Sequence, residues 1–237
     1  MPLRCDFHAH TSLDPLDLIA HSPYGYVDRA AALGFDVVCL THHEARICPD
    51  DVIAYGRKKG VLVIPGAEAT IEGAHVLLIN IRPGELERVR TMADIAKVRR
   101  KDTLIIAPHP FYCWPAAALR KKLVETPGLF DAVEWSHFYN GLWNLPNVKA
   151  AKFARDTGLT LIGASDCHNL KFFGTSYSLV DAKEKTATSV IAAVKAGKVH
   201  AASRPLGLWE FVRYSFWLAW LTVRNVMPGK PVSEPHL

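Results

Sequence analysis

The sequence predicts an α/β fold, a barrel of about seven β-α units that is closed or distorted, followed by an added C-terminal helix. Short apolar runs rich in Val, Ile and Leu recur along the 237 residues and alternate with helix-like stretches, a pattern typical of parallel strands connected by helices. Gly34, Gly60 and Gly158 each follow a helix-like stretch and precede an apolar run, where a helix commonly ends. About seven such repeats indicate a barrel that is closed or distorted.

The expected strands are short and apolar, as strands buried on both faces are. In chain order they are Leu3–Phe7, Phe35–Leu40, Val61–Ile64, His75–Asn80, Leu104–Ala107, Ala132–Trp135 and Leu159–Gly163. Helices are expected between them at Tyr26–Leu33, Asp51–Lys59, Glu85–Arg100, Ala116–Leu123 and Asn147–Asp156. A helix at Thr188–Ala196 and a short strand at Val199–Ala202 are expected in the last part of this domain, residues 1–205.

Residues 206–237 differ in composition and form a second expected unit, an aromatic-rich helix and tail. Leu208–Val226 is rich in aromatic residues, but its charge-free part, Tyr214–Val223, is too short to span a bilayer, which takes about 20 apolar residues. Trp209, Phe216 and Trp220 share one helical face. We therefore predict no transmembrane segment, and a helix that packs these aromatic side chains against the barrel or against a second copy in a homo-oligomer.

The composition indicates an ordinary globular protein of a reducing compartment. Hydrophobic residues make up 49% and charged residues 22%, and the net charge of +5 is too small to indicate a nucleic-acid-binding protein. The five cysteines are widely spaced and form no CxxC pair, which argues against a disulfide scaffold or a zinc finger. Residues 1–10 show no signal peptide. A cytoplasmic location is expected.

Histidine and acidic residues gather at the ends of the expected strands. These residues are Asp6, His8 and His10 at the first strand, His42 and His43 at the second, Glu68 after the third, His75 at the fourth, His109 at the fifth, and Asp166 and His168 at the seventh. The carboxyl ends of barrel strands converge on one face, so these side chains are expected to meet there. His75 begins its strand instead, which favours an antiparallel strand at that place.

The spacing within this set suits metal binding. In His8-Ala9-His10 both imidazoles point to the same side of an extended chain, and Asp166-Cys167-His168 repeats this with a carboxylate. Imidazole and carboxylate ligands suit Zn, Mn and Fe. Several such ligands can hold two or three divalent ions, which can clamp both oxygens of an in-line phosphoryl displacement.

Six segments carry a resemblance to a known family. Residues 6–12, 40–43, 64–68, 73–76, 107–110 and 163–168 read DFHAHTS, LTHH, IPGAE, GAHV, APHP and GASDCH. In this order they resemble the motifs of the PHP family, the polymerase and histidinol phosphatase domains. The resemblance implies a PHP-type distorted (β/α)7 barrel with two or three metal ions. His42 stands where the family usually has Asp, and APHP and GASDCH each have one residue more than the family motif.

The resemblance also implies which residues hold the metal ions. The implied ligands are His8, His10, Asp14, His43, Glu68, His75, His109, Asp166 and His168. Residues 133–140, VEWSHFYN, echo the V-E-x-x-N segment of the family. Within and near these segments His42, Glu134, His137 and Asn140 are implied as residues that bind substrate or support the ligands.

A metal-dependent hydrolase of phosphate esters is therefore expected. It would use a metal-bridging hydroxide on phosphomonoesters or on nucleotide and oligonucleotide phosphodiesters, with Mn, Fe or Zn as cofactor. Its expected partners are a phosphorylated small molecule, a nucleotide or a short oligonucleotide. Two alternatives remain: an amidohydrolase-type metal hydrolase, whose bridging lysine is missing from the central strand ends here, and a non-catalytic binding or regulatory module with the PHP fold.

Overall fold

The computed structural model describes residues 1–113 and 117–226, without the side chains of residues 222, 225 and 226. Its strands are β1 (Leu3–Asp6), β2 (Val37–Leu40), β3 (Leu62–Ile71), β4 (Ala74–Ile79), β5 (Leu104–Ala107), β6 (Ala132–Ser136), β7 (Thr160–Ala164), β8 (Ser176–Val180) and β9 (Val199–Ser203). Its α-helices are α1 (Pro23–Ala32), α2 (Asp50–Lys58), α3 (Lys121–Glu125), α4 (Leu145–Thr157), α5 (Ala187–Lys195) and α6 (Leu208–Val226). Three short 3₁₀ segments are η1 (Leu86–Arg88), η2 (Met92–Lys97) and η3 (Pro127–Leu129).

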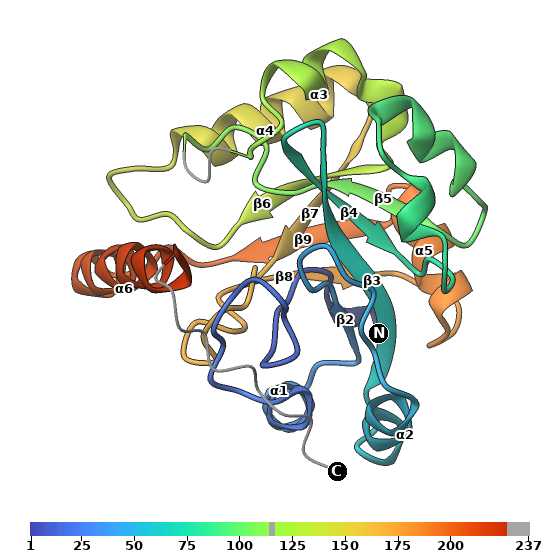
Figure 1. The fold of residues 1–237 in the computed structure, drawn as a ribbon, viewed down its shortest axis with the longest axis horizontal. Helices are drawn as coiled ribbons and strands as arrows, with labels where there is room; N and C mark the ends of the chain where they lie inside the picture. Colours follow the sequence, from blue (N-terminus) through green and yellow to red (C-terminus); the bar gives the residue numbers. More distant parts are fainter. Residues whose placement is uncertain (114–116, 227–237) are drawn as a thin grey trace.

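The strands form a nearly closed, barrel-like sheet in the order β7-β6-β5-β4-β3-β2-β1-β8-β9 (Figure 1). Pairing is parallel from β1 through β3 and from β5 through β7. Strand β4 is antiparallel to both β3 and β5, as predicted from the position of His75. Strands β8 and β9 add an antiparallel edge beside β1. The sheet therefore departs from seven repeated β-α units.

The barrel closes where β7 crosses β8. Gly163 in β7 donates its backbone N–H to the Ser178 hydroxyl at 3.0 Å, and that hydroxyl donates to the Gly163 carbonyl oxygen at 2.8 Å. A Cβ at Gly163 would lie 2.4 Å from the Tyr177 carbonyl oxygen, so only glycine permits this approach. Beyond β1, the backbone of Cys167 donates to His8 and accepts from His10. These bonds bring the ends of β1 and β7 together.

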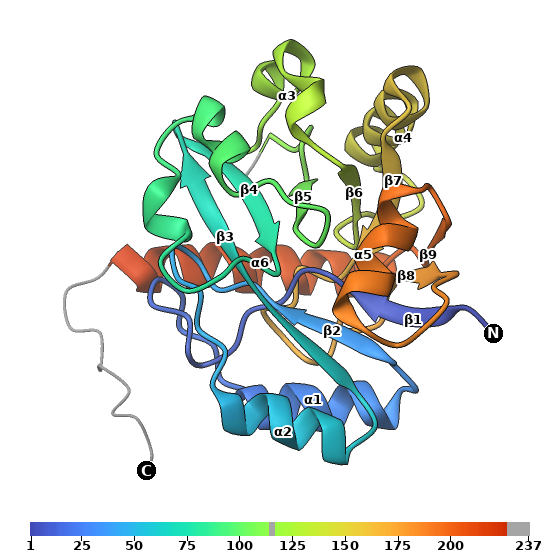
Figure 2. The same cartoon turned by 90° about the vertical axis from the view of Figure 1, so that its right-hand side faces the viewer.

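Alternate strand residues divide into an inner and an outer core. Cys5, Val37 and Cys39 point into the barrel, where Ile191 of α5 packs against the same cluster. Helices α1 and α2 cover one side of the sheet, and α3 and α4 cover the opposite side (Figures 1 and 2). Helix α5 covers one end of the filled barrel. The polar residues that follow the strands lie at the opposite end of the barrel.

Helix α6 lies across that end of the barrel, as Figure 2 shows. Tyr214 packs against Phe172 and Leu206, and Phe211 stacks on Phe138 with ring centroids 4.6 Å apart. Among the described residues, no helix has the length and apolar character needed to cross a membrane.

The face of α6 that contacts the barrel does not carry the three aromatic residues expected to pack against protein. Trp209, Phe216 and Trp220 are 77%, 74% and 51% exposed in the single chain, so they do not pack against the barrel, and their contact with a second copy stays a prediction. Aromatic residues lie on both faces of this helix, so periodicity alone could not select the buried one. The expected tail residues 227–237 lie outside the described residues.

Other differences from the expected elements have local causes. The helix expected at Glu85–Arg100 is two 3₁₀ segments, because Val89 is extended and Thr91 caps a new turn that begins at Met92. Of the helix expected at Ala116–Leu123, the described part is helical only from Lys121. Strand β8 was not predicted from its Ser-Tyr-Ser sequence.

Candidate metal centre

The strand ends bring eight of the nine predicted ligands together. His8 and His10 follow β1, His43 follows β2, and His109 follows β5. Glu68 lies in β3, and His75 lies in β4, whose reversed direction places its first residues at the same end of the barrel. Asp166 and His168 follow β7.

Glu68 lies at the centre of this cluster. Its Oε2 atom is 3.2 to 3.3 Å from the Nε2 atoms of three imidazoles, those of His8, His10 and His43. Its Oε1 atom is 2.8 Å from His75 Nδ1 and 3.3 Å from His109 Nε2. One buried carboxylate thus faces five imidazole nitrogens, three on one oxygen and two on the other.

Asp166 forms a second focus beside Glu68. Its Oδ1 atom lies 3.3 Å from His8 Nε2, 3.5 Å from His10 Nε2 and 3.3 Å from His168 Nδ1. The ligand atoms of the cluster form four overlapping triplets, each with its atoms within 4.8 Å of one another. The triplets are His8–Glu68–His109, His43–Glu68–His75, His8–His10–Asp166 and His10–His43–His168.

Two further carboxylates hold the imidazoles from behind. Asp14 Oδ2 accepts from His10 Nδ1 at 2.8 Å and from His43 Nδ1 at 3.0 Å. Glu134 Oε2 accepts from His8 Nδ1 at 2.8 Å. A carboxylate that accepts from Nδ1 leaves the Nε2 lone pair directed into the cluster, the usual arrangement behind a metal-bound histidine. Asp14, predicted as a ligand, lies outside the four triplets and occupies this supporting position.

The donor set fits divalent cations. With Nδ1–H committed to Glu134 and to Asp14, neutral His8 and His10 would point two Nε2 lone pairs at each other across 3.1 Å. Among the described residues, the buried Asp166 Oδ1 atom has no hydrogen-bond partner with suitable geometry, although three imidazole nitrogens surround it. A cation bound between these nitrogen and oxygen atoms would satisfy both the facing lone pairs and the unpaired carboxylate oxygen. Imidazole and carboxylate together suit Mn, Fe or Zn.

The titration behaviour of the cluster points to the same need for positive charge. Burial alone would lower the pKa of His8 and His10, but the surrounding carboxylates outweigh it and raise the pKa of both imidazoles well above the usual value. Burial would raise the pKa of Glu68, but the neighbouring imidazoles, His75 first, hold it well below its usual range. Protons on the imidazoles can balance the carboxylates in the way that cations would.

Two members of the cluster have a backbone conformation that is rare for residues with a side chain. His109 has a φ of 30° and Asp166 a φ of 43°. Such residues persist only where the surrounding structure holds them, at roughly 1–3 kcal/mol each, and they collect at functional sites. His109 lies in APHP and Asp166 in GASDCH, the two motifs that have one residue more than the family pattern. The extra residue and the unusual turn occur together in both segments.

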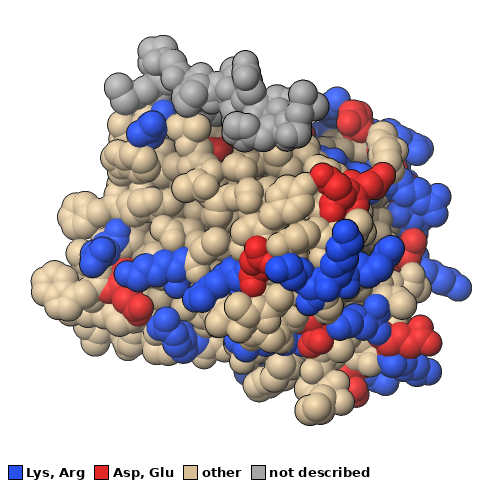
Figure 3. Space-filling view, turned by 90° about the horizontal axis from the view of Figure 1, so that it is seen from below, with Lys and Arg blue, Asp and Glu red and all other residues tan. Residues whose placement is uncertain are grey.

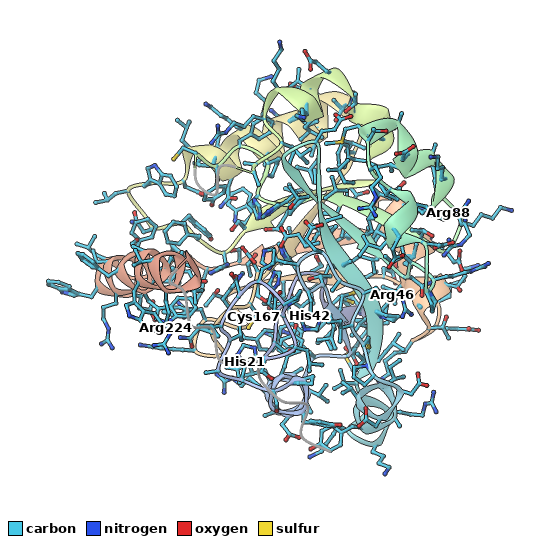
Figure 4. All side chains as sticks on the ribbon, viewed as in Figure 1. His21, His42, Arg46, Arg88, Cys167 and Arg224 are labelled. Carbon is cyan, nitrogen blue, oxygen red and sulfur yellow. The ribbon has the colours of Figure 1, made fainter. Side chains whose placement is uncertain are left out.

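The residues predicted to support the site divide between two places. Glu134 supports His8, and His137 lines a cavity over the cluster. His42, labelled in Figure 4, is instead bonded within the fold, with Nε2 2.7 Å from the Thr11 hydroxyl and Nδ1 3.0 Å from the Ile47 carbonyl oxygen. Asn140 accepts from the backbone of residues 142 and 143 and stabilises a turn. Neither His42 nor Asn140 is among the described residues that line the cavity.

The structure also places residues at the site that sequence reasoning missed. Asp17 Oδ2 lies 2.9 Å from His168 Nε2 and lines the cavity. Asp17 stands seven residues after His10 and Asp14 four, and spacing alone does not distinguish the two. Tyr112 and, from α6, Tyr214 also line the cavity, which has a volume of about 240 Å³. No sequence motif indicates that α6 lines the cavity, and this contact is evident only in the three-dimensional structure.

Comparisons with known proteins agree with the predicted family. A family model described as PHP-associated matches residues 144–199. No curated protein matches the sequence. Among solved structures, a two-domain protein from Bacteroides vulgatus containing a predicted PHP-like metal-dependent phosphoesterase is 21% identical, with a TM-score of 0.67 over 92% of this chain and 70% of that one. The predicted resemblance to the PHP family is confirmed.

Two other similar structures carry different activities in their names. The lesion-specific endonuclease EndoQ from Pyrococcus furiosus is 14% identical, with a TM-score of 0.59 over 91% of this chain and 66% of that one. An amidohydrolase from Chromobacterium violaceum is 16% identical, with a TM-score of 0.51 over 69% of this chain and 87% of that one. At these identities the likeness concerns the fold alone.

Proposed function

We propose, from its PHP-type fold and motifs, that the chain is a metal-dependent phosphoesterase whose active site is the cavity over Glu68. The observation that carries the proposal is the convergence of five imidazole nitrogens on the Glu68 carboxylate, with Asp166 beside them. The residues that would hold two or three Mn, Fe or Zn ions are His8, His10, His43, Glu68, His75, His109, Asp166 and His168.

Bound divalent ions would supply Lewis-acid stabilisation of the charge on the phosphate and would activate water. The protein's own residues prepare the site for this chemistry. Asp14 and Glu134 fix the orientation and tautomer of three imidazoles. Burial of the cluster lowers the local dielectric, so each electrostatic interaction there is stronger than in water.

Both phosphomonoesters and phosphodiesters belong to the proposed substrate range. The phosphoesterase named among the similar structures supports phosphate esters in general. The endonuclease supports nucleotide or oligonucleotide substrates. These names belong to those proteins, so the class of ester hydrolysed here has to be decided by the lining of this cavity and by assay.

The amidohydrolase alternative has one similar structure in its favour. Such sites often contain a bridging lysine, and no lysine is among the described residues lining this cavity, where Glu68 occupies the central position. A non-catalytic module with this fold would have lost ligands, whereas eight candidates converge here. Both considerations favour the phosphoesterase.

The test is an activity screen on the full chain purified without chelators and supplemented with Mn, Fe or Zn. The panel contains an aryl phosphomonoester, an aryl phosphodiester, a short oligonucleotide, a lactone and an N-acyl amino acid. We expect hydrolysis of at least one phosphate ester, lost on chelation and restored by metal. Cleavage of the lactone or amide alone would contradict the proposal, and so would metal-independent hydrolysis.

A further inference from the structure

The cavity has two sides of different chemistry. We call the metal-ligand candidates its floor. The facing side, here called the roof, includes Tyr112, His137, Phe138, Tyr214, Leu218 and Leu221, and Asp17 and Ser136 complete the lining. Three of these belong to α6, which crosses the open end of the barrel (Figure 2). The roof is therefore aromatic and apolar, with one imidazole, and a bound phosphate ester would lie between it and the floor.

His137 is the polar group of the roof whose ring nitrogens have no partner in the described part of the chain. The residue is only 2% exposed, yet neither ring nitrogen has a hydrogen-bond partner among the described residues. Burial lowers its pKa to about 4, so the imidazole is neutral at pH 7 and offers one donor and one acceptor. Buried polar groups are nearly always paired. An unpaired imidazole in a cavity wall is suited to pair with a ligand.

The position of His137 relative to α6 is set by packing. Its ring centroid is 5.2 Å from that of Tyr214, and the two planes meet at 62°. Tyr214 also stacks on Trp217 of the same helix, with centroids 5.5 Å apart. The helix therefore contributes apolar surface to the cavity and also positions the one imidazole of the roof.

The charge of the lining limits the ligand. Among the described residues that line the cavity, there is no Lys and no Arg. Lys and Arg side chains lie instead on an outer face, interspersed with acidic ones (Figure 3). Proteins that bind nucleic-acid strands use a positively charged groove along the backbone. Here metal ions on the floor could neutralise one phosphate, and a second phosphate would find no Lys or Arg among the described residues of the lining.

The size of the cavity adds a second limit. Its volume of about 240 Å³ lies below the roughly 300–1,000 Å³ of pockets that enclose drug-sized ligands. An oligonucleotide with one phosphate on the floor would extend out of the cavity past α6. A small molecule could lie entirely within the cavity.

We propose that the substrate is a small phosphomonoester with a single phosphate and an uncharged, ring-bearing alcohol portion. The ring packs against Tyr112, Phe138 and Tyr214, and a polar group on the alcohol portion hydrogen-bonds His137. Hydrolysis breaks the bond between phosphorus and the alcohol oxygen, and water supplies hydroxyl to phosphorus and a proton to the alcohol. The inference rests on the proposed phosphoesterase activity and narrows its substrate class.

The first test replaces His137 while keeping its shape. In His137→Phe the ring remains and both nitrogens are lost, so KM for the best ring-bearing monoester is expected to rise roughly tenfold, the scale of one hydrogen bond. His137→Gln, which keeps a donor and an acceptor, should recover part of this loss. Metal content should be unchanged, and the melting temperature of His137→Phe should equal or exceed that of the wild type, because two unpaired buried atoms are removed. An unchanged KM in His137→Phe would overturn the role of His137.

The second test uses two adjacent residues of α6 as a matched pair. Leu218 lines the cavity, whereas Ala219 is exposed on the same helix. Leu218→Trp is expected to raise KM for ring-bearing monoesters at least tenfold, and Ala219→Trp to leave it within twofold. Equal effects of the two variants would show that α6 is not part of the substrate site.

The third test is a substrate comparison on the wild-type chain, loaded with Mn. Aryl phosphates and nucleoside monophosphates should have a kcat/KM at least tenfold above those of glycerol phosphate, a sugar bisphosphate and a tetranucleotide. Preference for the bisphosphate or the tetranucleotide would overturn this inference and leave the phosphoesterase proposal intact. Hydrolysis of no phosphate ester would overturn the phosphoesterase proposal itself.

Discussion

The floor and the roof of the cavity are built from different kinds of sequence information. The floor comes from short motifs at the ends of successive strands, and the polar residue types are themselves the signal. The roof comes from α6 and from residues that follow β5 and β6, and apart from one imidazole it is made of ordinary apolar and aromatic side chains. Motifs thus locate the chemistry of such a site, whereas the part that selects the ligand depends on which helix packs over it.

The largest effect is expected from removing the centre of the floor. Glu68→Ala leaves five imidazoles without the carboxylate they share, so mutual repulsion between bound cations is no longer offset. Activity should fall by more than ~10²-fold, the scale for the loss of preorganised electrostatic stabilisation. Steady-state kinetics and metal content should be measured together. Near-normal values for both would show that Glu68 is not central.

A smaller effect is expected from changing Asp14, which supports two histidines of the floor. Asp14→Asn keeps the shape of the side chain but weakens the bonds from His10 and His43. Metal affinity should fall about 10- to 100-fold, as is typical for supporting partners of metal ligands. Titration of metal-free protein with Mn or Zn would measure it. Complete loss of one ion at saturating metal would instead make Asp14 a direct ligand.

The smallest expected effect concerns His42, a buried histidine that lies near the floor but not at the cavity. Burial, with the nearby His10, lowers its pKa to about 4, whereas an unfolded chain has the usual value of 6.5. Between these values the unfolded chain binds a proton that the folded chain does not, so stability falls as pH falls from 6.5 to 4.

His42→Gln should remove this contribution and can still bond Thr11 and the Ile47 carbonyl oxygen. The slope of unfolding free energy against pH should decrease by up to about 1.4 kcal/mol per pH unit in that window. Urea unfolding of metal-free wild type and variant between pH 4 and pH 7.5 measures both slopes. Parallel curves would show that His42 does not titrate in this way.

The sequence could predict the fold as far as local pattern determines it. Leu104–Ala107 and the neighbouring apolar strands were recognised because they are buried on both faces. Strand β8 was not, because Ser176 and Ser178 are polar residues buried against the barrel closure at Gly163. That role depends on a contact between distant parts of the chain.

The same distinction holds within the site. The spacing of His8 and His10 was sufficient to predict that both imidazoles meet in one cluster, since period-two alternation places them on one side. Asp14 and Asp17 could not be assigned from spacing, because the loop after β1 has no period. The face of α6 that meets the barrel could not be predicted, because Trp209 and Tyr214 lie on different faces of one aromatic helix and only packing against Phe172 and Leu206 selects between them.

The most direct test of the metal centre is elemental analysis of the full chain purified without chelators. Eight converging ligand candidates in four overlapping triplets predict about two or three transition-metal ions per chain. Removal of these ions should lower the melting temperature, and added Mn or Zn should restore it. Less than one equivalent of metal, with no gain in stability on adding Mn or Zn, would contradict the account.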